Sequence, residues 1–487
     1  MSMRLEPACC LVALLSVAPA ACGHGGAAGP APGVPLAPNG PAVGVWLTTP
    51  SGARLLSHER DVHFGAGAPP AGTTLTVDDA IQYQEMVGFG ASMTDASAWL
   101  IETKLPAAQR DALMQELFGR NPGIGLSFMR LTIGASDFSM HDYSLDDMPP
   151  GETDPALARF SIDSNRPYLL PAVKQAYAIN PQLRIMASPW SAPGWMKTTG
   201  SLIQGTLTPG GYPALAEYLR RYVRAYESEG IPIFALTVQN EPHYEPASYP
   251  GMRLDPGQRA KLLEEHLGPL FARDGLRTKI LDWDHNWDQP GSPLAVLGDT
   301  AARKYVAGVA WHCYGGDVSA QGAVHDAHPD KEAYFTECSG GNWAPVWADN
   351  LKWFVGTLVI DATRNWAKGV LLWNLALDEN SGPHLGGCAD CRGVVTIGST
   401  TGSVTRNVEY YALAHASRFV KPGAHRIASS SDIEGVKSVA FRNADDGSKV
   451  LIVLNTAPLE RTVVVRWSGR TFSYVVPAGA AVTFHWP

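Results

Sequence analysis

Charged residues are scarce in this 487-residue chain: Asp, Glu, Lys and Arg together make up 17% of it. The scarcity excludes long, charged, disordered segments. Basic residues are also in the minority, with 38 Lys and Arg against 46 Asp and Glu, and the formal net charge is -8. Because a polyanion would meet repulsion, we expect no nucleic-acid partner.

Long hydrophobic runs are missing outside the N-terminus. No later segment approaches the roughly 20 apolar residues of a transmembrane helix, so we expect no membrane span. Arg4, the apolar stretch Cys9 to Val17 and the small residues from Ala18 to Gly23 have the layout of a signal peptide. We therefore expect residues 1–23 to direct export, which gives a secreted, cell-surface or periplasmic protein. Ala20-Ala21-Cys22 also matches a lipoprotein cleavage site, so a lipid anchor at Cys22 stays open as an alternative.

Cysteine is sparse: of seven, three lie within the first 22 residues. Cys388 and Cys391 form a CxxC pair. No second pair accompanies it, and an oxidising compartment favours a disulfide over half a zinc site. Cys313 and Cys338 end two predicted strands, and we expect them to be free thiols that pack as small hydrophobic side chains.

Two common catalytic motifs are absent. No Gly-rich phosphate loop follows a strand and no GxSxG turn occurs, which leaves phosphoryl and acyl transfer without support. Residues 282–288 and 325–328 are rich in Asp and His, but neither spacing matches a known metal site. We expect neither a metal nor a cofactor.

The middle of the chain alternates short apolar runs with helical segments, the pattern of a parallel sheet buried on both faces. Eight such runs predict a (β/α)8 TIM barrel over residues 86–393. The runs are Met86 to Met93, Leu126 to Gly134, Leu183 to Trp190, Phe234 to Glu241, Thr278 to Asn286, Val306 to Tyr314, Glu332 to Cys338 and Gly369 to Leu377. Helices are expected between them, including Ala107 to Leu117, Tyr212 to Glu229 and Pro256 to Arg273.

The two ends of the chain differ from the middle in composition and in hydrophobic pattern. Residues 24–42 are dense in Gly, Pro and Ala, which is typical of a flexible linker. Residues 43–85 and 394–487 contain short alternating segments separated by turn formers. Because the N-terminal strands have no other partner, we expect both ends to build one β-sandwich domain beside the barrel. The clearest strands are Val43 to Thr48, Thr73 to Val77, Val450 to Leu454, Thr462 to Trp467, Ser473 to Val476 and Ala481 to Phe484.

Two predicted barrel strands end in a glutamate. The fourth ends Gln239-Asn240-Glu241-Pro242 and the seventh ends Thr336-Glu337-Cys338. Barrel active sites lie at the C-terminal ends of the strands, and strands four and seven face each other across the mouth. Hydrolysis of a glycoside needs two carboxyl groups, one that donates a proton and one that attacks the sugar. We predict Glu241 as general acid/base and Glu337 as nucleophile.

Other polar and aromatic residues end the same strands and are candidates for binding a sugar. Asn240 is expected to donate to the sugar 2-hydroxyl, and Trp190 to offer an apolar face. For Arg130, the alternative is a buried ion pair that orients a carboxylate; for His312, it is a structural role. Tyr314 is expected to hydrogen-bond the nucleophile. The full set of substrate-binding candidates is Arg130, Asp137, Trp190, Asn240, His312, Tyr314, Trp373 and Asn374.

These motifs together resemble glycoside hydrolase family 30, which contains glucosylceramidases and microbial endo-β-1,6-glucanases. The resemblance rests on Gly88 to Asp95, Arg130, Ser136 to Ser139, Ala187 to Thr198, Gln239 to Pro242, His312 to Tyr314, Thr336 to Cys338 and Trp373 to Leu377. It implies a barrel with a side β-domain, Glu241 as acid/base and Glu337 as nucleophile. It also implies that Asp137, Trp190, Asn240 and Trp373 hold the sugar. Cys313 and residues 284–288 look closer to the glucanase branch.

The sequence and the resemblance thus predict a retaining β-glycosidase that acts on β-1,6-glucan or on a β-glucoside such as glucosylceramide. Xylan and other β-glycosides are alternative substrates. A carbohydrate-binding protein without catalytic activity is the alternative from another functional class. The pair Glu241 and Glu337 argues against that alternative, because a binding protein needs no carboxylates at catalytic positions.

Overall fold

The computed structural model describes residues 40–67 and 69–487. The predicted signal peptide, Cys22 and most of the predicted linker lie outside these residues. The signal peptide, the lipid anchor and the linker therefore remain predictions. The last linker residue, Ala42, is the first residue of strand β1.

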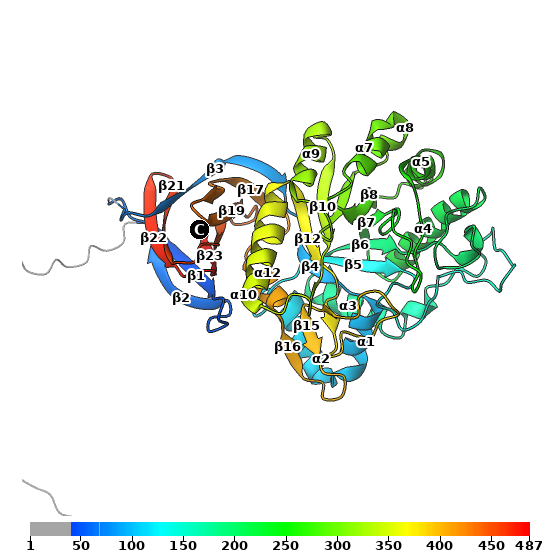
Figure 1. Ribbon diagram of the computed structural model, residues 1–487, viewed down its shortest axis with the longest axis horizontal. Helices are drawn as coiled ribbons and strands as arrows, with labels where there is room; N and C mark the ends of the chain where they lie inside the picture. The colour runs from blue at the N-terminus through cyan, green and yellow to red at the C-terminus, as the bar shows by residue number, and fades with distance from the viewer. Residues whose placement is uncertain (1–39, 68) are drawn as a thin grey trace, which may run out of the picture. The chain divides into compact units, whose positions relative to one another are not determined.

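Eight parallel strands close into the predicted barrel in the order β10-β12-β4-β5-β6-β7-β8-β9 (Figure 1). Each of the eight apolar runs contains or overlaps one of these strands, which confirms the fold class. The strands are β4 (Gly88–Ser92), β5 (Phe128–Ile133), β6 (Arg184–Pro189), β7 (Ile233–Thr237), β8 (Lys279–Asn286), β9 (Gly308–His312), β10 (Glu332–Glu337) and β12 (Ala367–Leu372).

Helices lie between consecutive barrel strands. The predicted helix from Pro256 to Arg273 is one continuous segment whose middle turns are a π-helix, η3. The helical segments are α1 (Asp95–Lys104), α2 (Ala107–Phe118), η1 (Asp163–Asn165), α3 (Leu169–Ile179), η2 (Gly194–Met196), α4 (Gly211–Ser228), α5 (Pro256–Lys261), η3 (Leu262–Leu267), α6 (Gly268–Arg273), α7 (Gly291–Gly298), α8 (Thr300–Arg303), α9 (Ser319–Ala327), α10 (Trp347–Trp353), η4 (Phe354–Asp361), α11 (Ala362–Arg364) and α12 (Val408–Ser417).

The interior of the barrel is built in layers. A lower layer is apolar and formed by one inward side chain from each of several strands: Phe128, Met186, Ala235, Leu281, Ala310, Tyr334 and Leu371. Successive inward side chains on a strand are two residues apart, so the next layer up is occupied by the residue two positions later. That layer carries the polar site described below.

The β-domain is a sandwich formed by both parts of the chain, as predicted. Its strand order is β2-β1-β23-β20-β19-β17-β3-β21-β22, with β18 beside β19. The long strand β3 joins the two layers, since its first half pairs with β21 and its second half with β17. The strands are β1 (Ala42–Thr48), β2 (Ser57–His63), β3 (Thr73–Glu85), β17 (His425–Ser429), β18 (Asp432–Ile433), β19 (Val436–Arg442), β20 (Lys449–Asn455), β21 (Arg461–Trp467), β22 (Arg470–Val476) and β23 (Ala481–Trp486).

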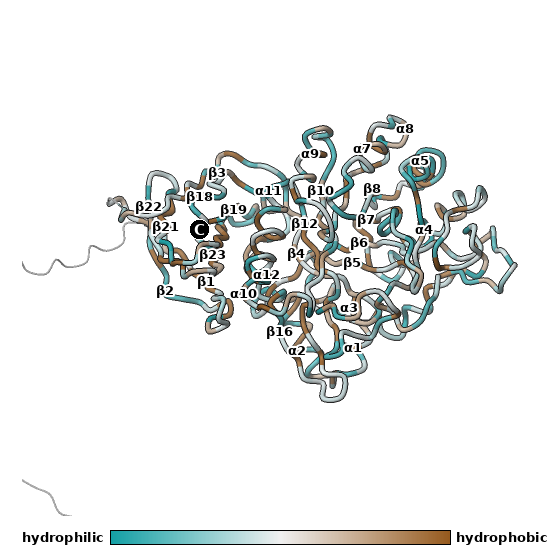
Figure 2. Tube along the Cα trace, in the orientation of Figure 1, coloured by the Kyte–Doolittle hydropathy of each residue, from teal (hydrophilic) through white to brown (hydrophobic). Residues whose placement is uncertain are grey.

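Strand β20 is buried on both faces. Leu451 and Val453 point into the sandwich core, whereas Val450, Ile452 and Leu454 belong to the large core that includes the barrel helices. This explains why β20 reads as an unbroken apolar run in the sequence. Figure 2 colours the chain by hydropathy and shows hydrophobic stretches among the barrel strands, around β4 and β12.

The sequence-based boundary at residue 394 differs from the structure. The next strand of the β-domain, β17, begins at His425. Before it come short strands outside the β-domain and helix α12, which packs against β4 and η4 and completes the eight strand–helix units of the barrel. The short strands of this region and of the loops are β11 (Gly340–Gly341), β13 (Ala376–Leu377), β14 (Cys391–Arg392), β15 (Val395–Ile397) and β16 (Val404–Arg406).

The structure confirms one prediction about cysteine and corrects another. Cys388 and Cys391 form the expected disulfide. The prediction that Cys313 and Cys338 are free thiols is wrong, because they form a second disulfide. The reason is register: β9 and β10 are neighbours with His312 opposite Glu337, so the residues that follow are also adjacent, with their Cα atoms 5.4 Å apart.

In residues 40–67 and 69–487, no helix combines the length and the apolar character that crossing a membrane requires.

Candidate active site

The polar layer of the barrel follows directly from the two-residue repeat of its strands. Each inward polar side chain comes two positions after an inward apolar one: Arg130 after Phe128, Ser188 after Met186, Thr237 after Ala235, His312 after Ala310 and Thr336 after Tyr334. All five polar side chains are fully buried or nearly so. They form the floor beneath the mouth of the barrel.

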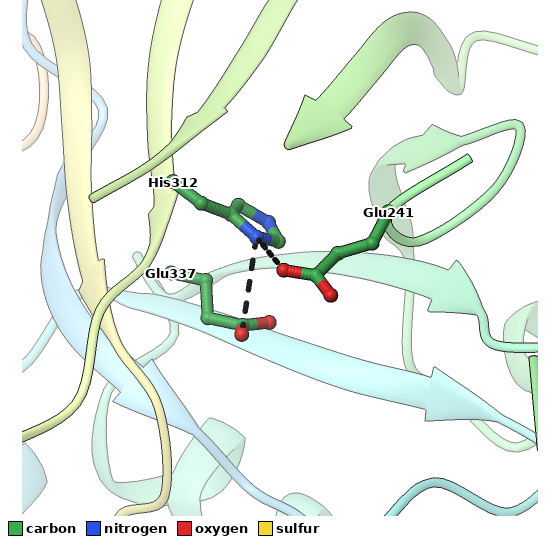
Figure 3. Close-up of side chains that lie close together, drawn as sticks. All are labelled: Glu241, His312 and Glu337. Carbon is green, nitrogen blue, oxygen red and sulfur yellow. Dashed lines mark hydrogen bonds and ion pairs between the residues drawn. The ribbon is translucent and has the colours of Figure 1, made fainter. Parts of the chain in front are cut away.

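The two predicted catalytic carboxylates meet above this floor (Figure 3). One oxygen of Glu241, one oxygen of Glu337 and one ring nitrogen of His312 all lie within 4.8 Å of one another. This proximity fits the separation of about 5–5.5 Å between the carboxyl groups of retaining glycosidases, and it leaves too little room for the water molecule of an inverting enzyme. The structure therefore brings together the pair that the sequence singled out.

Glu241 follows β7 in a strained backbone conformation. Its φ angle is 45°, which is rare for a residue with a side chain. Its backbone N–H donates to the carbonyl of Asp284 at 3.0 Å and fixes it to the end of β8. Such strained positions gather at functional sites, and Trp283, Asp284 and Asn374 in the same region also have positive φ.

Glu337 is held by two donors. Arg130 Nη1 donates to Oε2 in a buried ion pair, and the Tyr314 hydroxyl donates to Oε1 at 3.0 Å. Tyr314 thus makes the contact that the sequence analysis expected. Of the two roles considered for Arg130, the geometry is that of the ion pair, since the guanidinium also bonds Asp284 and Asn240, both at 2.7 Å.

Asp284 is the centre of the buried network, and sequence reasoning did not single it out as a site residue. One carboxylate oxygen accepts from Arg130, Ser188 and Thr237, and the other from His312 and Thr336, at 2.7–3.0 Å. The positive charge of Arg130 and these hydrogen bonds outweigh burial and hold the pKa of Asp284 well below its usual range. Its permanent negative charge therefore anchors the two cations of the site.

His312 connects this network to the acid/base candidate. Its Nε2 lies 3.0 Å from Asp284 Oδ1 and its Nδ1 lies 3.1 Å from Glu241 Oε1. Burial opposes the charged ring, but the carboxylates of Glu337, Asp284 and Glu241 prevail and raise the pKa of His312 to about 9. At neutral pH both nitrogens therefore carry protons and donate. The structural role considered for His312 is thus combined with direct contact to a catalytic candidate.

The pKa of Glu241 is raised, as a general acid requires. Burial is the largest cause, the hydrogen bond and positive charge of His312 oppose it, and the negative charge of Glu337 adds to the increase. Burial likewise raises the pKa of Asp137, helped by the charges of Glu337 and Glu241. Asp137 Oδ1 has no hydrogen-bond partner among the described residues, which suits a group that binds a sugar hydroxyl.

The remaining candidates for sugar binding make different contacts around the two carboxylates. Trp190 and Trp373 stack on each other with ring centroids 4.9 Å apart, and the Arg130 guanidinium lies 4.8 Å above Trp190. Asn240 Oδ1 accepts from Arg130, which leaves its amide nitrogen as the donor. Asn374 is fully buried and accepts from the Thr94 hydroxyl, so the structure places its side chain in the wall of the barrel.

Glu241, His312 and Glu337 are also close enough to share a metal ion. Arg130 and the charged ring of His312 already neutralise this cluster, and a further cation would meet their repulsion. The donor set is thus better suited to a pair of reacting carboxylates.

Comparison with known proteins agrees with this geometry. The profile of the glycosyl hydrolase family 30 TIM-barrel domain matches residues 86–420, and that of the glycosyl hydrolase family 30 beta sandwich domain matches residues 423–484. The chain belongs to glycoside hydrolase family 30. It is therefore a glycoside hydrolase, and the separation of its carboxylates is that of a retaining member.

Two relatives and one solved structure are similar to this family 30 chain over most of its length. It is 36% identical to an endo-1,6-beta-D-glucanase of Neurospora crassa, over 88% of this chain and 93% of the relative. It is 30% identical to a putative glucosylceramidase 1 of Caenorhabditis elegans, over 91% and 88%. The solved structure of the endo-beta1,6-glucanase BT3312 superimposes with a TM-score of 0.83 at 33% identity, over 91% of this chain and 99% of that one.

Proposed function

We propose that this family 30 enzyme is a retaining endo-β-1,6-glucanase, with Glu241 as general acid/base and Glu337 as nucleophile. The observation that carries the mechanism is the close approach of the two carboxylates beside His312. Identity of 36% with the Neurospora crassa endo-1,6-beta-D-glucanase over most of both chains supports the substrate.

In the first step, one carboxylate oxygen of Glu337 attacks the anomeric carbon of the sugar. Glu241 gives its proton to the glycosidic oxygen, the bond between that oxygen and the anomeric carbon breaks, and a glycosyl ester forms on Glu337. Arg130 and Tyr314 hold the nucleophile in place for attack. In this proposal Asp137 and Asn240 bind hydroxyls of the same sugar ring.

In the second step, water cleaves the ester and Glu241 takes its proton. Formation of the ester removes the negative charge of Glu337, which had helped to raise the pKa of Glu241. The pKa of Glu241 therefore falls when the intermediate forms, and the acid of the first step becomes the base of the second. His312 stabilises the ionised form because it donates to Glu241.

Glucosylceramide is the second candidate substrate, because the chain is also 30% identical to a putative glucosylceramidase over 91% of its length. The site argues against a protein that binds carbohydrate without catalysis. A buried network of ion pairs around Glu337 and Asp284 has a large desolvation cost, and binding alone gains nothing from it.

The deciding experiment is hydrolysis of a substrate panel: pustulan as β-1,6-glucan, β-1,3-glucan, xylan, an aryl β-glucoside and glucosylceramide. We expect rapid release of β-1,6-linked oligosaccharides from pustulan, with the β-anomer formed first in proton NMR spectra. Glu337→Gln is expected to remove nearly all turnover while the protein stays folded. An α-anomer formed first, or an active Glu337→Gln enzyme, would refute the mechanism. Turnover of glucosylceramide alone would refute the substrate.

We further propose that the enzyme works outside the cytoplasm. Two disulfides in the described part of the chain suit an oxidising compartment. Intact-mass analysis of the exported protein distinguishes cleavage after the predicted signal peptide from lipidation of Cys22.

A further inference from the structure

A pocket of about 450 Å³ lies next to the catalytic pair. Its walls come from the ends of β9 and β10, the loop after β10, and α10, and the residues that matter here are Cys313, Tyr314, Cys338, Trp343 and Trp353. None of them belongs to the group formed by Asp137, Trp190, Asn240 and Trp373 that is expected to hold the reacting sugar.

Tyr314 connects the pocket to the catalytic centre. Tyr314 lines the pocket, and its hydroxyl donates to Glu337 at 3.0 Å. Tyr314 as a whole is 45% exposed, but removal of its hydroxyl from water and the nearby charges of Glu337 and Glu241 raise the pKa of Tyr314 well above its usual value, so the hydroxyl keeps its proton. A chain whose reacting sugar touches Glu337 would therefore have another sugar unit within reach of the pocket.

Trp343 offers a large exposed aromatic surface in this pocket. The residue is 54% exposed, although burial of a tryptophan is strongly favourable. The indole lies against Gly341: a Cβ atom there would stand 1.9 Å from Cζ3 of the ring. The absence of a side chain at Gly341 is what allows the ring to rest on the backbone.

The loop that carries Trp343 is fixed at several points. Gly340 and Gly341 pair with Arg392 and Cys391 as a short two-stranded sheet. The disulfide of Cys338 holds the start of this loop to β9. A surface that is already ordered loses little conformational entropy when a ligand binds.

The partner strand is anchored in the same way. Cys391 is tied by its disulfide to Cys388, and Arg392 forms an ion pair with the buried Glu409 at 2.7 Å. The backbone N–H of Asn342 donates to the carbonyl of Asp390 at 2.9 Å. Two disulfides and a partly buried ion pair thus position one exposed indole.

We infer that Trp343 is the stacking platform of a second sugar subsite, which binds a glucosyl unit adjacent to the one that reacts. This inference rests on the proposed function, since the ligand is a further unit of the same β-glucan. Sugar rings present apolar C–H faces that pack on an aromatic ring, and a preformed, exposed indole beside a catalytic pair suits such a face. The subsite makes the enzyme prefer oligosaccharides to single glucosides.

The test compares two kinds of substrate that differ in whether they occupy the proposed subsite. β-1,6-linked glucose oligosaccharides of two to six units need the subsite, whereas β-glucosyl fluoride has no sugar as leaving group and does not. For Trp343→Ala we expect kcat/KM on the longer oligosaccharides to fall by about tenfold, and by much less on the fluoride. Trp343→Phe, which keeps an aromatic face, should recover most of the loss.

A second variant leaves the indole in the protein and moves it. Gly341→Ala places a methyl group where the ring lies, so it should lower the oligosaccharide to fluoride ratio in the same direction as Trp343→Ala. Equal falls on both substrates for Trp343→Ala would indicate a general disturbance of the site and overturn the inference. An unchanged ratio in both variants would overturn it as well.

Failure of the proposed function can be distinguished from failure of this inference. If the wild-type enzyme cleaves another β-glycan instead of the β-1,6-linked series, the proposed substrate is wrong. The ratio is then measured with oligosaccharides of that glycan. Calorimetric titration of the folded Glu337→Gln protein with the same oligosaccharides gives a second readout that does not depend on turnover. We expect weaker binding when Trp343→Ala is added, and unchanged affinity would overturn the inference.

Discussion

Glu241 has two tasks in the proposed mechanism, and only the first depends on the leaving group. With a natural glucan, Glu241→Ala is expected to lower the rate by the roughly 10²–10⁴-fold that general acid catalysis contributes. With a dinitrophenyl glucoside, the first step should survive and the ester on Glu337 should accumulate. Azide, which needs no general base, should then restore turnover and give a β-glycosyl azide, detectable by mass spectrometry and NMR. Equal losses on both substrates without rescue by azide, in a folded protein, would contradict the role of Glu241.

A second prediction for a single residue concerns Asp284. Asp284→Asn removes the negative charge that five donors share, so Arg130 and His312 lose their common partner. We expect kcat to fall about 10²-fold through misplacement of Glu337 and Glu241. The pKa of His312 should fall from about 9 as one of its negative partners is lost, so a limb of the pH–rate profile due to His312 would shift to lower pH.

Asp282→Asn is the matched control for this substitution. Asp282 lies on the same strand, is also fully buried, and is also paired with a buried arginine, Arg259, at 2.7 Å. The control should lower thermal stability but keep most of kcat, because Arg259, the partner of Asp282, contacts neither catalytic carboxylate, whereas the partners of Asp284 contact both. A comparable loss of kcat in both variants would show that Asp284 acts only through stability.

At the scale of residues, the sequence identified side chains that directly follow a predicted strand. It did not identify a side chain whose importance depends on contacts with several strands inside the barrel. Glu241 and Glu337 were predicted because each directly follows an apolar run. Asp284 lies in a polar run at the end of β8, and its importance appears only when donors from β5, β6, β9 and β10 are brought together. The two-residue repeat would have indicated Trp283 instead, because Asp284 comes three positions after Leu281, at a shift in register between β8 and β9.

Strands β9 and β10 are joined by the Cys313–Cys338 disulfide, which spans 25 residues of sequence, whereas Cys388–Cys391 spans 3. Loop-closure entropy then assigns about 3.5 kcal/mol to the first bridge and about 1.6 kcal/mol to the second. The double variant Cys313→Ser/Cys338→Ser should therefore lose more in Tm than Cys388→Ser/Cys391→Ser, as measured by calorimetry of the oxidised proteins. Equal losses, or the reverse order, would contradict the entropic account.

Helix α12 is joined to the β-domain through His415, which is fully buried between Thr48 of β1 and Thr483 of β23 at 2.8 and 2.9 Å. Burial lowers the pKa of His415 to about 3. Its neutral ring is fully compatible with the fold above pH 6.5, and stability is lost as pH falls from about 6.5 towards 3, because only the unfolded chain takes up the proton. At pH 5 the loss is about 2 kcal/mol.

The measurement is Tm as a function of pH for the wild type and His415→Gln, whose amide can also bond both threonines but does not titrate. We expect the variant to lose less Tm than the wild type between pH 6.5 and 4. Parallel curves would show that His415 does not control acid stability. Comparing the two proteins cancels the opposite contribution of buried acids such as Asp95, whose pKa is raised to about 6 by burial.

Whole elements were predicted where burial leaves a pattern in the sequence. The eight barrel strands and β20 are buried on both faces, and their apolar runs were visible. Strand β2 reads Ser57-His58-Glu59-Arg60-Asp61-Val62-His63 and forms the exposed edge of its sheet, where charged residues are normal and leave no hydrophobic signal. The π-helix η3 lies within a predicted helix, and its wider turns leave the hydrophobic period too little changed to detect.

Barrel and β-domain share one core, so neither should fold alone. Phe89 of β4 meets Phe441 of β19 edge to face with ring centroids 6.4 Å apart, and Leu454 of β20 lies against Gly356 of η4. A chain that ends at residue 420 would expose this apolar surface, and we expect it to be insoluble or unfolded. Soluble expression and far-UV circular dichroism against the full chain test this; a soluble, folded barrel would contradict it.

The order of strands at the edge of the sandwich has a consequence for biosynthesis. Strand β23 lies between β1 and β20, and β1 pairs with β2 on its other side. During synthesis the hairpin β1–β2 therefore has no partner strand in this sheet until the six-residue strand β23, Ala481–Trp486, has emerged. The β-domain is therefore completed only after β23 has been synthesised, and until then the hairpin β1–β2 presents an unpaired strand edge that favours aggregation.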